Sequence, residues 1–302
     1  MRNLALALLL GGLASIASAA ADFPLTAVAD GVLVHQGKHA SLEDPARGDS
    51  ANLGVVIGRR CVAVIDTGGS VATGRAFRAA VAAHTKLPVC YVINTHAHFD
   101  HVLGNPAFSD AGAAFVGHQD LPATIDASED YFSEHFAAER AGGAGKLLPA
   151  RGLWVKDTLS LDLGERELRL TAVPKAHSGA DLTVFDVASG TLFTGDLVFM
   201  ERLPVLDGSL RGWLSWLDAT RTQQLARIVP GHGPVSASWP AGAAPERAYL
   251  EAVETQAKAA IKAGSFLEDV LAGAESSPPA GWVLTQPHAR NLSKAFREFE
   301  WD

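Results

Sequence analysis

The chain has 302 residues, a formal net charge of −8 with neutral histidines, and 48% hydrophobic against 19% charged residues. The negative balance argues against non-specific nucleic-acid binding, and this much apolar sequence excludes a disordered chain. Two cysteines exclude a disulfide framework or a cysteine-rich zinc module, so the placement of the eleven histidines matters most for function.

The first 21 residues have the layout of a secretory signal peptide. Met1–Asn3 carries a positive charge, Leu4–Leu10 is apolar, and Gly11–Ala21 is rich in small residues that a signal peptidase accepts. An uncleaved membrane anchor is the alternative, because Leu4–Ala21 is almost long enough to span a bilayer. We expect residues 1–21 to be removed, leaving a periplasmic or secreted protein without stable membrane insertion.

The next 220 residues alternate between β-branched apolar runs and helical patterns. The predicted strands are Val32–His35, Leu53–Ile57, Cys61–Ile65, Pro88–Asn94, Ala114–Val116, Val155–Leu163, Glu167–Val173, Asp181–Phe185, Thr191–Phe193 and Ile228–Val229. The predicted helices run from a Ser70 cap to about His84, from Leu121 to about Arg140, and over Ser209–Arg221. This alternation indicates an α/β layered architecture, with sheets covered by helices.

The chain becomes helical after about residue 240. Pro245 begins a helix that Gly264 ends, Ser265 and Glu268 form a capping box for the next helix, and Asn291–Phe299 is amphipathic. No linker divides the chain. We therefore expect a catalytic domain at 22–240 and a helical extension at 241–302 packed on the same domain.

The two cysteines fall in strand-like stretches. Cys61 and Cys90 could pair in an oxidising compartment, and two separate buried thiols are the alternative. The sequence leaves both open, and it carries no signal for the oligomeric state.

One histidine-rich turn follows the predicted strand that ends at Asn94. His96 and His98 lie two residues apart and project to the same side of an extended backbone, and Asp100 and His101 follow once the chain turns. Four ligand-type side chains in six residues exceed what one tetrahedral ion needs from one segment, which predicts two adjacent metals. A polar surface turn would have to place this pattern after a buried strand by chance.

The motifs resemble those of the metallo-β-lactamase-fold hydrolase superfamily, over about Val32 to Val235. Beyond the turn at His96–His101, the matching positions are Asp66 in DTG, His177, Asp196 in TGD and His232 in GHG. The resemblance implies a four-layer αββα metallo-β-lactamase sandwich, with metals in a cleft at one edge of the sheets. It also implies that one metal is bound by His96, His98 and His177, the other by Asp100, His101 and His232, and that Asp196 bridges them.

The resemblance further implies a dinuclear hydrolase that uses a metal-bridged hydroxide to attack an ester, thioester, lactone or related bond. Two divalent metal ions are expected, with Zn²⁺ as first choice and Fe or Mn as alternatives. Asp100 would orient the hydroxide as the catalytic residue besides acting as a ligand. Asp66 would hold a ligand loop or a histidine tautomer, or cap the turn at Gly68–Gly69.

The expected partner is a small-molecule substrate and no nucleic acid. Met200, Glu201 and Arg202 follow the strand that carries Asp196, and with Asp207 they could line the cleft. Arg202 would hold a substrate anion or pair with Glu201 or Asp207.

The aromatic residues Tyr131, Phe132 and Phe136 are expected to pack a helix on the core, with a substrate wall as the alternative. The remaining histidines, expected in structural or surface roles, are His35, His39, His84, His118, His135 and His288.

Other functions are alternatives. A β-lactam-hydrolysing metallo-β-lactamase ranks second, because dedicated members generally lack an aspartate at the place of Asp196. Val198–Trp216 and Asn291–Trp301 are similar to exported zinc metallohydrolases associated with quinoprotein and sulfur-oxidation systems. A mononuclear iron sulfur-oxidation enzyme or a non-catalytic accessory protein of a quinoprotein system is therefore the alternative from another class.

Overall fold

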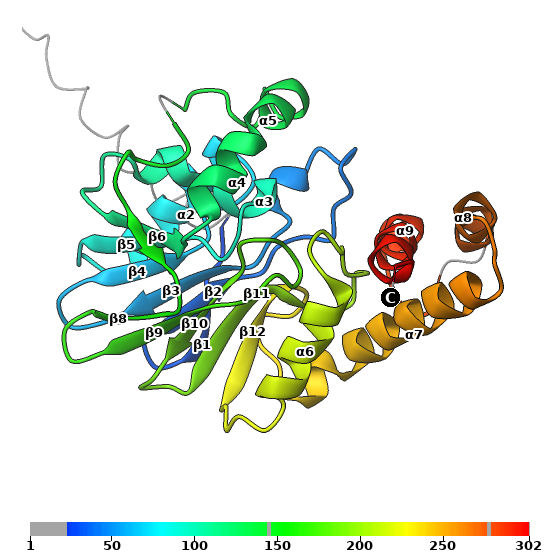
Figure 1. Ribbon diagram of the computed structural model, residues 1–302. Helices are drawn as coiled ribbons and strands as arrows, with labels where there is room; N and C mark the ends of the chain where they lie inside the picture. Colours follow the sequence, from blue (N-terminus) through cyan, green and yellow to red (C-terminus); the bar gives the residue numbers. More distant parts are fainter. Residues whose placement is uncertain (1–22, 144–145, 277–278, 302) are drawn as a thin grey trace, which may run out of the picture.

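Two β-sheets lie face to face, with helices on the outer face of each (Figure 1). This computed structural model describes residues 23–143, 146–276 and 279–301, so the predicted signal peptide at 1–21 lies outside the described residues. No helix in the described part of the chain is both long and apolar enough to cross a bilayer.

The first sheet is built by the N-terminal half of the chain. Its strands pair antiparallel from β1 to β4 and parallel from β4 to β7. In spatial order they are β1 (Thr26–Ala29), β2 (Val32–His35), β3 (Leu53–Ile57), β4 (Val62–Ile65), β5 (Val89–Ile93), β6 (Ala114–His118) and β7 (Leu153–Val155).

The second sheet contains the later strands. In spatial order they are β12 (Arg227–His232), β11 (Thr191–Phe199), β10 (Leu182–Asp186), β9 (Glu167–Ala172) and β8 (Thr158–Asp162). Only β11 and β12 pair parallel among these strands; the other pairs are antiparallel.

The side chains of β4 show why the two sheets stack. Val62 and Val64 lie in the core cluster that includes Phe77 of the covering helix α2 (Val71–His84). Ala63 and Ile65, on the opposite face, lie in the cluster formed with the second sheet. Because successive side chains of a strand point to opposite faces, a continuous apolar run buries both faces of the sheet.

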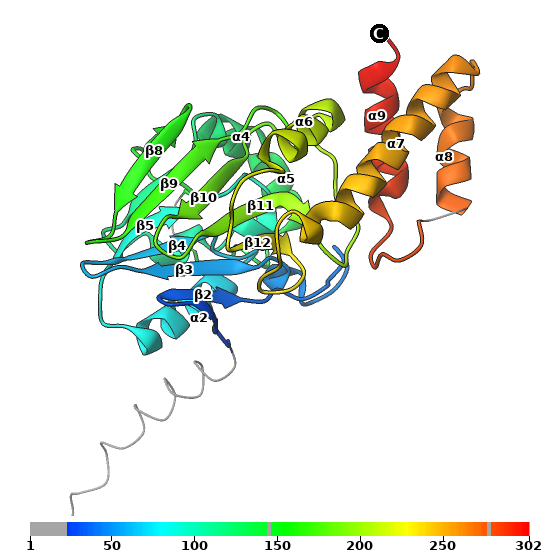
Figure 2. The same ribbon diagram turned by 90° about the horizontal axis from the view of Figure 1, so that it is seen from below.

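Helices cover the outer faces. Beside α2, the first sheet carries η1 (Arg47–Asp49), α3 (Phe99–Val102), η2 (Asn105–Phe108), α4 (Leu121–Ala127) and α5 (Glu129–His135). The second sheet carries α6 (Leu210–Thr220), η3 (Ala241–Ala243) and α7 (Ala244–Lys262), and then come α8 (Leu267–Ser276) and α9 (Pro287–Phe299). Figure 2 shows α7, α8 and α9 side by side at one end of the molecule. Leu250 of α7 and Leu292 of α9 share one buried cluster with Trp213 of α6.

Two predicted elements are wrong. The strand predicted over Val155–Leu163 is split between β7 in the first sheet and β8 in the second, because the exposed pair Lys156–Asp157 carries the chain from one sheet to the other. The helix predicted to run to about Arg140 is two helices and ends at His135, where Phe136 turns inward and stacks on Phe99.

The structure also extends the predictions. Strand β1 was not predicted, since its residues are largely exposed and carry no clear alternation. Strand β11 continues six residues past Phe193, and all nine of its residues are buried. Cys61 and Cys90 form a disulfide at the starts of β4 and β5, with Cα atoms 5.7 Å apart.

Candidate metal centre

Four of the predicted ligands lie in the turn after β5 and in α3. A polar network beneath the turn fixes its path: the Asn94 side-chain amide donates to the carbonyl of His101 at 3.2 Å and to Oδ1 of Asn105 at 3.1 Å. The Asn105 amide donates back to Oδ1 of Asn94 at 2.8 Å. The turn therefore holds its ligands in a defined arrangement; they are His96, His98, Asp100 and His101.

The other three predicted ligands come from the second sheet. His177 lies in the loop between β9 and β10, Asp196 lies within β11, and His232 ends β12. The backbone of β12 approaches β11 so closely that a Cβ on Gly231 would lie 2.0 Å from Oδ1 of Asp196. Only glycine fits at this position, which explains the first glycine of the GHG motif.

Three histidine nitrogens and one carboxylate form a first group of potential ligands. Nδ1 of His98 lies 3.0 Å from Nε2 of His96 and 3.0 Å from Nε2 of His177. Oδ2 of Asp196 lies 3.6 Å from Nε2 of both His96 and His177. The four side chains thus surround one point.

A second group consists of Asp100, His101 and His232. Nε2 of His101 lies 3.8 Å from Oδ1 of Asp100, and Nε2 of His232 lies 3.5 Å from Oδ2 of the same carboxylate. Asp196 also faces this group, with Oδ1 at 3.2 Å from His101 and Oδ2 at 3.3 Å from His232. The carboxylate of Asp196 therefore lies between the two groups.

The arrangement fits metal ions. Nε2 of His101 and Oδ1 of Asp196 are buried and lie 3.2 Å apart, but neither has hydrogen-bond geometry to the other or to another group of the described chain, which is unfavourable for buried polar atoms. Donor atoms bound to one tetrahedral zinc at ~2.0–2.1 Å lie about 3.3 Å apart, close to the spacings in both groups. Imidazole nitrogen and carboxylate oxygen are also suitable ligands for such ions.

The ring nitrogens that face away from the centre have partners of their own. Such outer contacts fix the orientation and tautomer of a metal-binding histidine. The contacts are His177 Nδ1 with the Val205 carbonyl at 2.7 Å, His232 Nδ1 with the Ser50 carbonyl at 2.8 Å, His101 Nδ1 with Asp66 at 2.8 Å and His98 Nε2 with Asp207 at 2.9 Å.

Burial and charge set the protonation of the centre. Burial lowers the pKa of His177 to about 3 and that of His96 well below its ordinary value, so both are neutral and can bind metal. Burial also opposes a proton on His101, but Asp196, Asp66 and Asp100 outweigh it and raise its pKa well above the ordinary value. The carboxylates around His101 therefore favour positive charge at that position, whereas His96 and His177 stay neutral.

The structure places Asp66 against the ligand turn. Its carboxylate accepts hydrogen bonds from Thr95 N at 2.8 Å, Thr95 Oγ1 at 2.7 Å and His101 Nδ1 at 2.8 Å. These are the hydrogen bonds of its side chain in the described chain, so it does not cap the turn at Gly68–Gly69. Sequence reasoning did not single out Ser50, whose hydroxyl donates to Oδ2 of Asp100 at 2.9 Å, because no local motif marks it.

The three candidate substrate contacts differ in position. Met200 and Glu201 do not line the cleft: Met200 packs against the core of the second sheet, and Glu201 lies 2.9 Å from His39. Arg202 lines it and pairs with neither Glu201 nor Asp207. Its Nη1 lies 3.3 Å from Nδ1 of His232, and its Nε is buried without a hydrogen-bond partner in the described chain.

The cleft over the centre encloses about 590 Å³. Phe99, Tyr131 and Phe132 form an apolar wall from the first half of the chain, whereas Phe136 packs beneath Phe99. Pro287 and Arg290 of α9 line the opposite side. Phe132 and Phe136 pack in the core as expected, and Tyr131 and Phe132 also line the cleft as the alternative proposed. The C-terminal extension contributes to the cleft as well.

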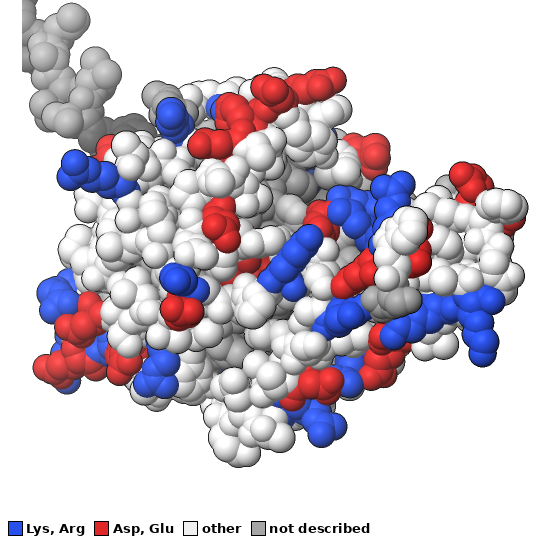
Figure 3. Space-filling view, in the orientation of Figure 1, with Lys and Arg blue, Asp and Glu red and all other residues white. Residues whose placement is uncertain are grey.

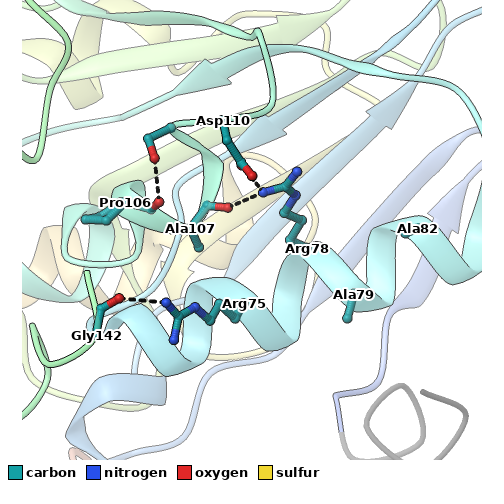
Figure 4. A pocket seen from close by; sticks show the side chains of 9 residues that line it. Arg75, Arg78, Ala79, Ala82, Pro106, Ala107, Asp110 and Gly142 are labelled. Carbon is teal, nitrogen blue, oxygen red and sulfur yellow. Dashed lines mark hydrogen bonds and ion pairs between the residues drawn. The ribbon is translucent and has the colours of Figure 1, made fainter. Parts of the chain in front are cut away.

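A second cavity, of about 520 Å³, lies beside α2 and contains none of the predicted ligands (Figure 4). Arg75 donates to the carbonyl of Gly142, while Arg78 donates to that of Ala107 and pairs with Asp110. With both guanidinium groups engaged, this cavity offers no comparable chemistry. On the face shown in Figure 3, basic and acidic side chains of the described residues are interspersed.

Solved structures share this fold. A metallo-beta-lactamase from Pontibacter korlensis is 17% identical with a TM-score of 0.60, covering 76% of this chain and 99% of its own. A beta-lactamase domain protein from Burkholderia ambifaria is 19% identical with a TM-score of 0.66, and the match covers 92% of this chain and 87% of its own. A double mutant of the sec-alkyl sulfatase PisA1 is 17% identical with a TM-score of 0.65, covering 94% of this chain and 52% of its own.

The comparison with curated proteins found no match. The family model of the metallo-beta-lactamase superfamily matches residues 46–232, which is more than half of the chain and spans every predicted ligand. This chain belongs to the metallo-β-lactamase superfamily.

Proposed function

We propose that this protein is an exported, dinuclear metal-dependent hydrolase that cleaves an ester, thioester, lactone or related bond in a small anionic substrate. The observation that carries the proposal is Asp196, whose carboxylate lies within 3.6 Å of histidine nitrogens in both ligand groups. His96, His98, Asp196 and His177 would hold one ion, and Asp100, His101, Asp196 and His232 the other. Zinc is the proposed metal, since these ligands suit it.

A pair of divalent ions here would supply a nucleophile at neutral pH and polarise a substrate oxygen. The chain itself positions the reacting groups. Despite its burial, Asp100 has a lowered pKa because His101 and His232 lie beside it, so it stays a carboxylate that can accept a hydrogen bond in the cleft. The Ser50 hydroxyl holds one of its oxygens, which leaves the other free to orient a water molecule.

The charge of the cleft supports an anionic substrate. Its described lining has four carboxylates and two guanidinium groups, so the net charge of −2 would become +2 with two divalent cations. Arg202 has no carboxylate partner there and lies next to His232. It would contact the substrate anion, while Tyr131 and Phe132 would contact an apolar part of the same molecule.

Export is part of the proposal. It is supported by the signal-like sequence of residues 1–21 and by the disulfide between Cys61 and Cys90, since such bonds persist mainly in oxidising compartments. Cell fractionation and N-terminal sequencing of the mature chain test it. Intact Met1 on a cytoplasmic protein would contradict it.

A β-lactam hydrolase is the second candidate, favoured by the fold it shares with metallo-β-lactamases. A mononuclear iron enzyme or a non-catalytic accessory protein ranks below both, because the residues of a second metal group are complete.

Metal analysis of the purified protein, combined with a substrate panel, tests the function. We expect two metals per chain and hydrolysis of a member of an ester, thioester, lactone, phosphodiester and sulfate-ester panel. His96→Ala should abolish activity, whereas the matched control His84→Ala, at an exposed histidine outside the cleft, should not. Rapid turnover of a penicillin or carbapenem would favour the second candidate, and a chain that cannot be loaded with metal would refute the proposal.

A further inference from the structure

The loop that follows β11 is held by the last helix of the chain. The side chain of Asn291, fully buried on α9, accepts a hydrogen bond from Leu206 N at 2.9 Å and donates to the Pro204 carbonyl at 2.7 Å. Glu298, two turns further along α9, accepts from Ser209 Oγ at 2.6 Å and from Leu210 N at 2.8 Å. Loop residues 204–210 are therefore fixed to the C-terminal extension.

A second contact acts at the start of the same loop. Val283, between α8 and α9, donates its N–H to the Glu201 carbonyl at 2.9 Å and accepts from Leu203 N at 3.0 Å. These two hydrogen bonds form a short parallel bridge between Val283 and Arg202, with one bond to the residue before Arg202 and one to the residue after it. The extension thus contacts the loop along most of its length.

The loop carries Asp207 to the metal centre. Oδ2 of Asp207 lies 2.9 Å from Nε2 of His98, and its backbone N–H donates to the carbonyl of His177 at 2.9 Å. Arg290 of α9 pairs with the other carboxylate oxygen, Oδ1. One carboxylate therefore joins a candidate ligand to the extension.

The contact between Asp207 and His98 bears on the tautomer of the His98 ring. His98 faces His96 and His177 through Nδ1, so Nδ1 must keep its lone pair to bind metal. A neutral imidazole carries a single N–H, which must then be on Nε2. An acceptor at Nε2 selects that tautomer and fixes the plane of the ring.

We propose that Asp207, held in place by Arg290, is a positioning residue for His98, and that the C-terminal extension thereby strengthens metal binding at the centre. The proposal rests on the proposed function, because it presumes that His98 binds metal. Asp207 itself belongs to neither ligand group. A merely structural ion pair on the rim of the cleft would leave metal affinity unchanged.

The test measures zinc affinity by competition with a chromophoric chelator, without any substrate. We expect Asp207→Ala to raise the Kd of one of two zinc ions by about 10–100-fold. Arg290→Gln, at the half-exposed end of the pair, should weaken the same site by a smaller factor. The matched control is Arg297→Gln, an exposed arginine on the same helix, which should bind both ions like the wild type.

A second readout follows the tautomer directly. In ¹H–¹⁵N spectra of the metal-free protein at alkaline pH, where the ring is neutral, His98 should show the proton on Nε2 in the wild type and a mixture of tautomers in Asp207→Ala. The signal is assigned to His98 by its absence from the spectrum of His98→Gln. Asn at position 207 keeps an acceptor oxygen, so Asp207→Asn should restore part of the affinity.

The outcomes separate the two proposals. If the wild type binds no zinc, the proposed function fails. If the wild type binds two ions and the folded variants Asp207→Ala and Arg290→Gln bind both equally well, the positioning role alone is refuted. Should Asp207→Ala fail to fold, unchanged zinc affinity in Arg290→Gln is sufficient to refute it.

Discussion

The carboxylate of Asp66 contacts Nδ1 of His101 at 2.8 Å, on the side of the ring opposite the centre-facing Nε2. The same carboxylate accepts two hydrogen bonds from Thr95, at the start of the ligand turn. Asp66 follows β4, at the carboxyl end of a strand parallel to β5. One side chain thus fixes both the beginning of the turn and the orientation of a histidine near its end.

Asp66→Asn should weaken metal binding in the group of Asp100, His101 and His232. The amide cannot accept from Thr95 N, Thr95 Oγ1 and His101 together, so His101 loses its fixed tautomer. We expect the zinc Kd of that site to rise by about 10–100-fold, measured by chelator competition. The control is Asp162→Asn, an exposed carboxylate distant from the cleft. An unchanged Kd would show that Asp66 serves the turn alone.

Asp196→Ala should affect both metals, because its carboxylate faces both groups. We expect less than one metal per chain and a loss of kcat/KM greater than about 100-fold, the upper range for removal of an outer partner. His177→Ala, which removes a ligand from the first group only, is the comparison. Mass spectrometry of native protein counts the ions. Two tightly bound metals in Asp196→Ala would exclude a bridging role.

Arg202→Met should raise KM for anionic substrates and leave KM for neutral analogues unchanged. A charge-assisted hydrogen bond is worth about 1.5–3 kcal/mol, so the increase should be about 10–100-fold. Arg202→Lys keeps the charge but loses the planar guanidinium group, so its KM for anionic substrates should lie between those of the wild type and Arg202→Met. Steady-state kinetics on a matched pair of esters, with and without the anionic group, checks this. Equal effects on both esters would contradict an anion contact.

Glu246→Gln should stabilise the protein increasingly as pH rises. Burial raises the pKa of Glu246 well above its ordinary value of 4.5, and Asp196 adds to the rise. Above pH 4.5 the unfolded chain loses this proton before the folded chain does, so the folded wild type loses stability that Gln retains. We expect a difference of roughly 1–3 kcal/mol at pH 8 and little at pH 4.5.

Urea unfolding of chelator-treated protein at both pH values measures this difference. Glu251→Gln, on the exposed side of the same helix, is the control. A stability difference that stays constant with pH would show that the buried carboxyl group is not the cause.

The sequence predicted what local patterns encode. The turn from His96 to His101 is visible because its ligands are neighbours, and the parallel strands β4 and β5 end beside each other, which brings Asp66 to the same edge. Helix α2 begins where Ser70 predicts, since the Ser70 side chain accepts from Thr73 N. These features depend on residues close in sequence or on strand order.

Other features depend on contacts between distant segments. Arg290 and Asp207 are 83 residues apart. Asp207 lies in the stretch Val198–Trp216 that the sequence singled out, but no local pattern marks Arg290 as its partner, so their pairing could not be predicted. The inward turn of Phe136 depends on Phe99 and on the Arg47 guanidinium 4.7 Å above its ring, and these contacts override helix propensity at 136–140. Arg202 was expected either to bind an anion or to form an ion pair, and only the structure shows that its neighbours are paired elsewhere.

The candidate ligands come from both sheets, and their contacts join positions as far apart as His96 and Asp196. Such non-local contacts require the long loops between them to close, at a cost in chain entropy. A nascent or partly folded chain therefore lacks the complete centre even though it already carries the histidine-rich turn. The amount of metal bound per chain in a preparation would then report the fraction of its molecules that are fully folded.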